Sequence, residues 1–341
     1  MKSNKRVEWV DIGKFICIMC VMFSHLESNN EVANIFIKYF FLNVFFFLAG
    51  YVYVSPTTFK THLTKKLKGL MIPWFVFGTF NIMLSSISSY KTDRNFMREM
   101  KINLLQVRGY GDRMWFVAAL FVAFIPFYFI IKYLNKNQAI AVVAISLVIR
   151  MLYLNFMPEN IFIWQTNALP WHIDYVPWSL LWMVLGYFFK TDWERIFDKG
   201  NKFLKAVILM SVYLVLVYTT ILYLPGPIGE VLATYIRPLS GVMAIISLCK
   251  IIKTNKYFAF VGANTLTYLA LHGKVEAVIE HVFKTKISAF YNMCLENAFY
   301  STLLGIIITI AVSLILIIPT IIINKWLPWV LGRPYRKKAT V

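Results

Sequence analysis

Residues 300–323 read YSTLLGIIITIAVSLILIIPTIII, a run dominated by Ile, Leu and Val that contains no charged residue. A helix needs about 20 consecutive apolar residues to cross the hydrocarbon core of a bilayer. This run is long enough, so it predicts a transmembrane helix.

The composition of the whole chain agrees with this interpretation. The 341 residues are 59% hydrophobic and 15% charged, with a mean hydropathy of +0.63. Soluble domains are about 45–50% apolar and about 25% charged. The composition therefore excludes an ordinary soluble globular protein and indicates a membrane protein with several spans.

Windows of about 19 residues identify ten apolar runs. They cover residues 8–26, 32–54, 70–88, 114–132, 138–155, 175–190, 203–224, 231–252, 257–279 and 300–323. We therefore expect an all-α polytopic membrane protein, with one membrane-embedded domain over residues 1–341. The run at 257–279 is the weakest, and without it the two termini would lie on opposite sides of the membrane.

The net charge of +19 tests this topology. The two tails and the segments near 55–69, 132–137, 190–205 and 250–256 contain 22 Lys and Arg against four acidic residues. The rest of the chain shares 13 basic and 12 acidic residues. Lys and Arg concentrate in cytoplasmic loops, so both termini are expected to be cytoplasmic. Because topology explains the excess, the charge does not indicate a nucleic-acid-binding protein.

Two other features restrict the function. Asp11 and Lys14 interrupt the first span and no small-residue cleavage pattern follows it, so we do not expect it to be a removable signal peptide. The longest polar insertion, residues 89–113, is too short for a separate catalytic domain, so any chemistry is expected in or at the membrane. The C-x-x-C of Cys17 and Cys20 lies in an apolar run without a βαβ context, where thiols act as small hydrophobes.

The first span carries three ionisable side chains, Asp11, Lys14 and His25. Such groups inside a membrane are costly and are candidates for function. Lys14 and His25 are eleven positions apart, which places them on one helical face, about 16 Å apart along the axis. Asp11 is close enough to Lys14 to pair with it, and His25 can act as a general base near the outer end. The alternative is that Asp11 and Lys14 extend to the interface and His25 only caps the helix.

Further charged groups lie within or beside the predicted spans. Arg150, Arg237 and His272 lie within predicted spans. Arg237 is either functional or an interfacial anchor, and His272 has either a direct role or an interhelical hydrogen bond. Lys65, Lys66 and Lys68 precede the third span, where they either stop translocation or attract phosphates on the cytoplasmic side.

Several of these segments together resemble the acyltransferase 3 family of integral membrane acyltransferases. RVEWVDIGK at 6–14, followed by Ser24-His25, resembles the first-helix signature of that family, and its Asp-x-x-Lys opening is similar to the fucose 4-O-acetylase-like branch. Five further segments agree in order: FFFLAGY at 45–51, the Lys65–Lys68 cluster before Pro73-Trp74, MWFVAALF at 114–121, LPWHID at 169–174 leading into LGY at 185–187, and GANTL at 262–266 with Leu271-His272. The chain departs from the branch at Phe41-Leu42-Asn43, which replaces a His-Met-Pro, and at Ala49, which replaces a Ser.

The resemblance implies a fold of about ten helices in a bacterial inner membrane. It implies transfer of an acyl group, usually acetyl, from cytoplasmic acyl-CoA to a sugar hydroxyl of an envelope polysaccharide or a lipid-linked precursor. The lysine cluster would then meet the CoA, His25 would take the hydroxyl proton, and Asp11 and Lys14 would complete the site. No permanently bound cofactor and no metal are implied.

The sequence also leaves four residue roles and one alternative function to be weighed. Four more residues are candidates for binding substrate or for structure: Trp115, Asp174, Arg237 and His272. The alternative function is a component of exopolysaccharide export, because some relatives of the family have been described as exporters. A transporter is expected to show internal repeats, and we find none in the sequence.

Overall fold

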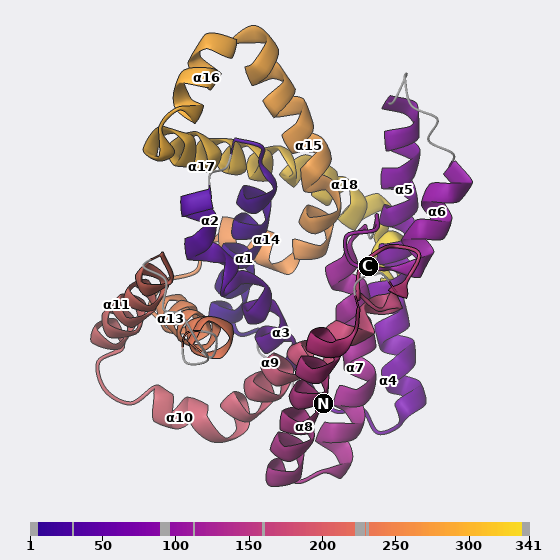
Figure 1. Ribbon diagram of the computed structural model, residues 1–341, viewed down its shortest axis with the longest axis vertical. Helices are drawn as coiled ribbons and strands as arrows, with labels where there is room; N and C mark the ends of the chain where they lie inside the picture. The colour runs from indigo at the N-terminus through magenta and orange to yellow at the C-terminus, as the bar shows by residue number, and fades with distance from the viewer. Residues whose placement is uncertain are drawn as a thin grey trace, which may run out of the picture. The chain divides into compact units, whose positions relative to one another are not determined.

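The computed structural model describes residues 6–28, 31–88, 96–111, 113–158, 161–221, 229 and 232–335. These residues form helices joined by short connections, with no β-strand among them (Figure 1). The expectation of an all-α protein is therefore confirmed.

The chain divides into two compact units, Met1–Leu48 with Phe189–Thr320, and Ala49–Phe188 with Ile321–Val341. The division falls inside two helices, α3 (Phe41–Tyr51) and α18 (Ile317–Trp326). The other elements of the first unit are α1 (Glu8–His25), α2 (Glu31–Lys38), η4 (Phe189–Trp193), α10 (Glu194–Phe197), α11 (Lys202–Ile221), η5 (Leu232–Ile236), α13 (Arg237–Cys249), α14 (Lys256–Ala263), α15 (Thr265–Lys286), α16 (Ser288–Leu295) and α17 (Ala298–Ile315). Those of the second unit are α4 (Phe59–Lys66), η1 (Leu67–Met71), α5 (Ile72–Ser88), α6 (Phe96–Leu105), α7 (Trp115–Tyr133), α8 (Lys136–Phe156), η3 (Pro170–Tyr175), α9 (Val176–Phe188) and η6 (Pro328–Leu331).

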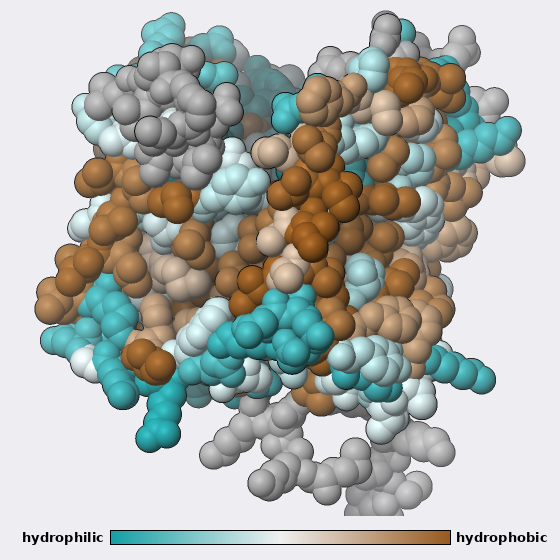
Figure 2. Space-filling model, turned by 60° about the horizontal axis from the view of Figure 1, so that its bottom comes forward, coloured by the Kyte–Doolittle hydropathy of each residue, from teal (hydrophilic) through white to brown (hydrophobic). Residues whose placement is uncertain are grey.

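Six helical segments are long and apolar enough to cross a membrane. They are Glu31–Tyr51, Phe59–Ser85, Trp115–Tyr133, Lys136–Phe156, Lys202–Thr219 and Ala298–Trp326. Exposed aliphatic side chains cover much of α8 and α11, and Figure 2 shows broad hydrophobic areas on the face it displays. Lipid tails suit such a surface, so the chain is a multi-pass membrane protein.

The predicted spans differ from the helices mainly where a helix is interrupted. The run at 32–54 is divided between α2 and α3, and the run at 257–279 is divided at Asn264, after which α15 continues to Lys286. The run at 300–323 changes from α17 to α18 at Leu316. Pro319 explains this break, because proline has no N–H to donate to the carbonyl of Ile315, four residues earlier.

Parts of the prediction lie outside the described residues. They are residues 89–95 and 112 of the polar insertion, residues 222–224 and 231 of two predicted spans, and residues 1–5 and 336–341 of the tails.

Several helices begin at polar side chains that cap them. Asn135 accepts a hydrogen bond from the backbone N–H of Gln138, whose own side chain accepts one from the Asn135 backbone N–H. Thr58 caps α4 in a similar way, and Asn255 caps α14. These contacts satisfy backbone donors that a helix start leaves without a partner.

Helix α1 is the centre of the first unit and contacts α13, α14, α15 and α17. Val10, Ile12, Cys17 and Met22 are buried on it. Gly262 of α14 lies directly against the backbone of Asp11, so closely that a Cβ atom would collide with the Asp11 carbonyl oxygen. This close approach depends on the missing side chain at position 262.

Helix α7 holds the second unit together and contacts α4, η1, η3 and α9. Its side chains Phe124, Phe127 and Tyr128 are buried in an aromatic cluster with Tyr53 and His62. The cluster orients the lysine-rich segment of α4 and η1.

We expect Gly262→Ala to destabilise the protein, because the added methyl group meets backbone rather than a movable side chain. Overpacking of this kind costs about 1–3 kcal/mol, so the thermal unfolding temperature of the detergent-purified protein should fall. Gly273→Ala in α15 is the control, since nothing lies within 4 Å of a Cβ there. Equal unfolding temperatures for the two variants would contradict the close approach of α14 to α1.

Candidate active site

His25 is the last residue of α1, and His272 of α15 lies beside it. The ring centroids are 5.3 Å apart. The side chain of His25 is exposed, whereas His272 is buried. The helix ends here because Leu26 has an extended backbone conformation. Both histidines were candidates from the sequence, and the fold brings their rings into contact.

The hydrogen bond of His272 determines which ring nitrogen carries the proton. Its Nδ1 lies 3.1 Å from the carbonyl oxygen of Tyr268. A carbonyl can only accept, so Nδ1 donates, and in the neutral ring Nε2 keeps a free lone pair. His272 is therefore able to accept a hydrogen bond through Nε2.

The end of α1 is held in place by three contacts. The backbone N–H of Ser28 donates to Glu280 Oε1 at 2.9 Å, and Ser301 Oγ of α17 donates to the Ser28 carbonyl at 2.6 Å. Lys284 forms an ion pair with Glu27. Because α15 and α17 both bind this segment, the position of His25 against His272 is supported from two helices.

Asp11 and Lys14 lie at the other end of α1. The buried carboxylate of Asp11 pairs with Arg6, and the Arg6 guanidinium also donates to the carbonyl of Ala259 at 2.6 Å. Lys14 makes no hydrogen bond or ion pair with any residue that the structure describes. The direct ion pair of Asp11 is therefore with Arg6, while Lys14 interacts with the Asp11 carboxylate only at longer range.

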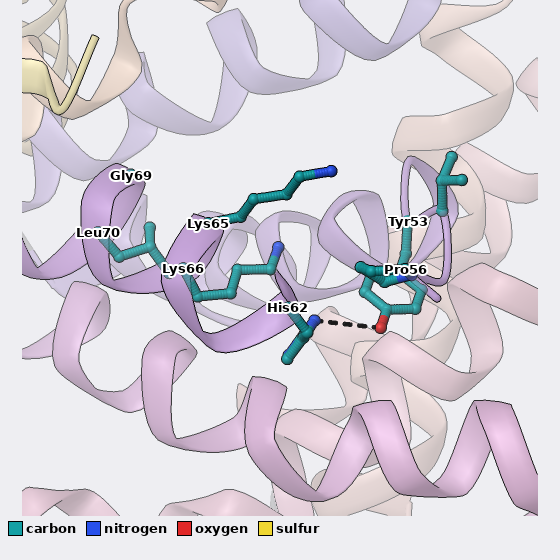
Figure 3. A pocket seen from close by; sticks show the side chains of 8 residues that line it. Tyr53, Pro56, His62, Lys65, Lys66, Gly69 and Leu70 are labelled. Atoms are coloured by element: carbon teal, nitrogen blue, oxygen red, sulfur yellow. Dashed lines mark hydrogen bonds between the residues drawn. The ribbon is translucent and has the colours of Figure 1, made fainter. Parts of the chain in front are cut away.

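Lys65 and Lys66 line a cavity of about 290 Å³ in the second unit (Figure 3). The other lining residues are Tyr53, Val54, Pro56, His62, Gly69 and Leu70. Lys68 is exposed and is not part of the lining. The cavity lies where the α-helix changes to the π-turn η1, a feature frequent at functional sites.

The cavity wall is ordered by hydrogen bonds and ring contacts. His62 Nε2 donates to the carbonyl of Phe124 at 2.9 Å, which leaves Nδ1 to accept from the Tyr53 hydroxyl at 3.3 Å. The Lys66 ammonium lies 3.2 Å from the centre of the Phe124 ring, a cation–π contact. Two ammonium groups at a cavity of this size can bind an anionic ligand such as a phosphate.

Trp115 and Asp174 belong to one polar network in the second unit. Asp174 accepts a hydrogen bond from the Leu169 backbone at 3.0 Å and forms an ion pair with Arg108 at 3.2 Å. Arg150 Nε donates to the Asp174 carbonyl at 3.0 Å. Asp174 is thus bound from three segments, which is sufficient to explain it structurally.

Trp115 packs against His172 in the same network, with 5.5 Å between ring centroids. His172 Nε2 lies 3.4 Å from Gln106 Oε1. Gln106, Met114, Trp171 and His172 all have positive φ angles, which are uncommon for residues other than glycine. The interactions of the network therefore support a strained backbone at this position.

Arg237 is buried and connects two helices of the first unit. Its Nε donates to the carbonyl of Leu216 in α11 at 2.8 Å, and its guanidinium lies over the Tyr39 ring. The side chain is only 3% exposed. The structure thus gives Arg237 a packing role between α11 and α13.

Residue-by-residue inspection missed two buried carboxylates, Glu276 and Glu280 of α15. Glu276 lies near the end of the predicted run 257–279 and Glu280 just beyond it. Their positions, four and eight residues after His272, were a detectable signal, because residues four apart share a helical face. Arg108 was also missed, since it belongs to the polar insertion.

The titration of His172 gives a testable consequence for stability. Burial lowers its pKa to about 4, and Arg108 lowers it as well, while Asp174 acts in the opposite direction. The unfolded chain binds a proton near pH 6.5, so stability should decrease between pH 6.5 and pH 4, by at most about 1.4 kcal/mol per pH unit from this group. His172→Asn, which tolerates a positive φ, should lose this part of the pH dependence of the unfolding temperature. The same slope in the wild type and the variant would contradict the buried neutral state.

Comparison with known proteins identifies the family of the chain. No curated protein and no solved structure matches the chain significantly. The family model Acyl_transf_3, described as an acyltransferase domain, matches residues 7–318 and so covers both histidines, the lysine cavity and the network around Asp174. The chain belongs to this acyltransferase family.

Proposed function

We propose that the chain is an O-acetyltransferase of a bacterial inner membrane. It moves an acetyl group from acetyl-CoA to a hydroxyl of a cell-surface polysaccharide or of its lipid-linked sugar precursor. The single observation that carries this proposal is the contact between His25 and His272, because it places an accessible imidazole against a buried one at the end of α1.

The topology in this proposal has ten spans with both termini cytoplasmic. The 22 basic residues of the tails and alternate loops support it. His25 then lies at the outer end of α1, where an acceptor sugar arrives. Lys65 and Lys66 precede the third span on the cytoplasmic side, where acetyl-CoA is available.

The donor binds at the lysine cavity. CoA carries several phosphates, and Lys65 and Lys66 provide two positive charges around a space of about 290 Å³. His62 and Tyr53 hold the wall of the cavity in a defined shape through their hydrogen bond.

The reaction replaces the thioester bond of the donor with an oxygen ester bond to the acceptor. The acceptor oxygen attacks the thioester carbonyl while His25 takes the hydroxyl proton. The carbon–sulfur bond then breaks, the CoA sulfur leaves with the electron pair, and the proton is returned to that sulfur. His272 can hold the His25 ring in position, because its Nε2 can accept a hydrogen bond from an N–H of that ring.

We expect His25→Ala to abolish acetylation while the protein remains folded and abundant. The loss should be at least about 100-fold, since a positioned base typically contributes 10²–10⁴-fold. O-acetyl signals in the NMR spectrum of the surface polymer are the measurement. The matched control is His281→Ala, an exposed histidine of α15. Normal O-acetyl signals in the His25→Ala strain would rule out its catalytic role, and loss of the polymer itself would favour export.

We expect Lys65→Gln with Lys66→Gln to weaken acetyl-CoA binding. Removal of two phosphate contacts should raise the KM for acetyl-CoA about tenfold or more, with a smaller change in kcat. The control is Lys60→Gln, because Lys60 is an exposed lysine of the same helix and does not line the cavity. An unchanged KM in the double variant would place the donor elsewhere.

A further inference from the structure

One face of α15 carries a buried column of polar side chains. Tyr268, His272, Glu276 and Glu280 follow one another at intervals of four residues, and all four are buried. Residues four apart lie on the same helical face, about 6 Å apart along the axis. The column therefore extends from the histidine pair toward the Ser28 contact.

Three of the four side chains have a structural explanation. The Tyr268 hydroxyl donates to the carbonyl of Ser313, and His272 donates to the carbonyl of Tyr268. Glu280 accepts the hydrogen bond of the Ser28 backbone and so holds the end of α1. Packing and hydrogen bonding account for these positions.

Glu276 is different. The residue is 3% exposed, and its Oε1 has no hydrogen-bond partner among the residues that the structure describes. A buried polar atom without a partner costs about 1–3 kcal/mol, and more when the group is charged. Stability alone therefore does not explain a carboxyl group at this position.

The nearest groups that can carry a positive charge on this face are the two histidines. His272 is one helical turn from Glu276, and His25 lies against His272. A carboxylate near an imidazole favours the protonated ring. Ionised Glu276 and a cationic histidine pair would therefore stabilise each other, as coupled groups do.

Two other charged groups of this column have partners: Glu280 is bound to Ser28, and Lys284 is paired with Glu27. Helix α17 contributes no charged side chain. The remaining titratable groups of α15 itself are Tyr268, Lys274, His281 and Lys286. Those of the elements that pack against α15 are Glu8, Asp11, Lys14, Cys17 and Cys20 of α1, Lys256 and Tyr257 of α14, Tyr291 and Cys294 of α16, and Tyr300 of α17.

We propose that Glu276 is a positioning residue whose carboxylate stabilises the imidazolium formed when His25 takes the acceptor's proton. This inference rests on the proposed acyl transfer, since it assigns Glu276 a task in the same reaction. The only bonds that change are those of the transfer itself. The carboxylate makes His25 a stronger base by balancing the charge that the proton brings.

The kinetic test compares Glu276→Gln with Glu280→Gln. For Glu276→Gln we expect the plateau of kcat to fall about tenfold and the acidic limb of the pH–rate profile to shift to lower pH by about one unit. The KM for acetyl-CoA should stay unchanged. Glu280→Gln keeps an oxygen that accepts the Ser28 hydrogen bond, so its pH profile should match the wild type. Equal losses in both variants, or an unshifted limb in Glu276→Gln, would overturn the proposal.

A second measurement does not require acyl transfer. Diethyl pyrocarbonate modifies neutral imidazoles, so the rate of modification of His25, followed by mass spectrometry against pH, reports its titration. We expect His25 to titrate about one pH unit lower in Glu276→Gln than in the wild type. The same titration in both proteins would refute the role of Glu276, even if the chain transfers no acyl group.

Two further variants separate charge from folding. Glu276→Met, a neutral replacement of similar volume, substitutes for Glu276→Gln if that protein does not fold, with the same expected shift. Glu276→Asp keeps the charge, so its His25 should titrate close to the wild type. An Asp variant that behaves like the neutral variants would show that the effect is not electrostatic.

Discussion

Ionisable side chains in an apolar surrounding need partners, and this constraint organises both units. Hydrocarbon offers no water to solvate a charge, so a buried charge is paired, hydrogen-bonded or kept neutral. Asp11 is paired with Arg6, and Asp174 is bound by Arg108 and by the Leu169 backbone. In the first unit, Lys250, which follows α13, lies between Glu194 and Asp198. The pairs of Asp174 with Arg108 and of Lys250 with Glu194 and Asp198 also connect segments that are distant in sequence, so these contacts contribute to the packing.

The groups without such partners are the ones that point to chemistry. His25 is exposed beside a buried histidine, Glu276 keeps an unpartnered oxygen, and Lys65 and Lys66 face a cavity. In the proposed acyl transfer, the end of α1 would supply a base for the acceptor, and the lysine cavity at the π-turn of η1 would supply a cationic site for the donor.

The all-α class could be predicted from the sequence, because apolar run length is a local property. The catalytic role of His25 stays a prediction from its place in such a run. The breaks at Leu316 and Asn264 were missed, since a hydropathy window averages over a helix interruption. The direct ion-pair partner of Asp11, Arg6, was also missed. Helical spacing indicates which residues of one helix approach each other, but Arg6 precedes the helix and reaches the carboxylate from its flank.

Composition, run length and the position of charges were enough to establish that this is a multi-pass helical membrane protein, because the bilayer imposes the same requirements on every chain that crosses it. Which polar groups meet was decided only by tertiary structure. His25 and His272 are 247 positions apart in sequence, and Ser28 meets Glu280 across a similar separation. Such contacts depend on which helices pack together, and here the absence of a side chain at Gly262 lets α14 lie directly against α1. That packing, rather than any local pattern, brings the polar face of α15 to the end of α1.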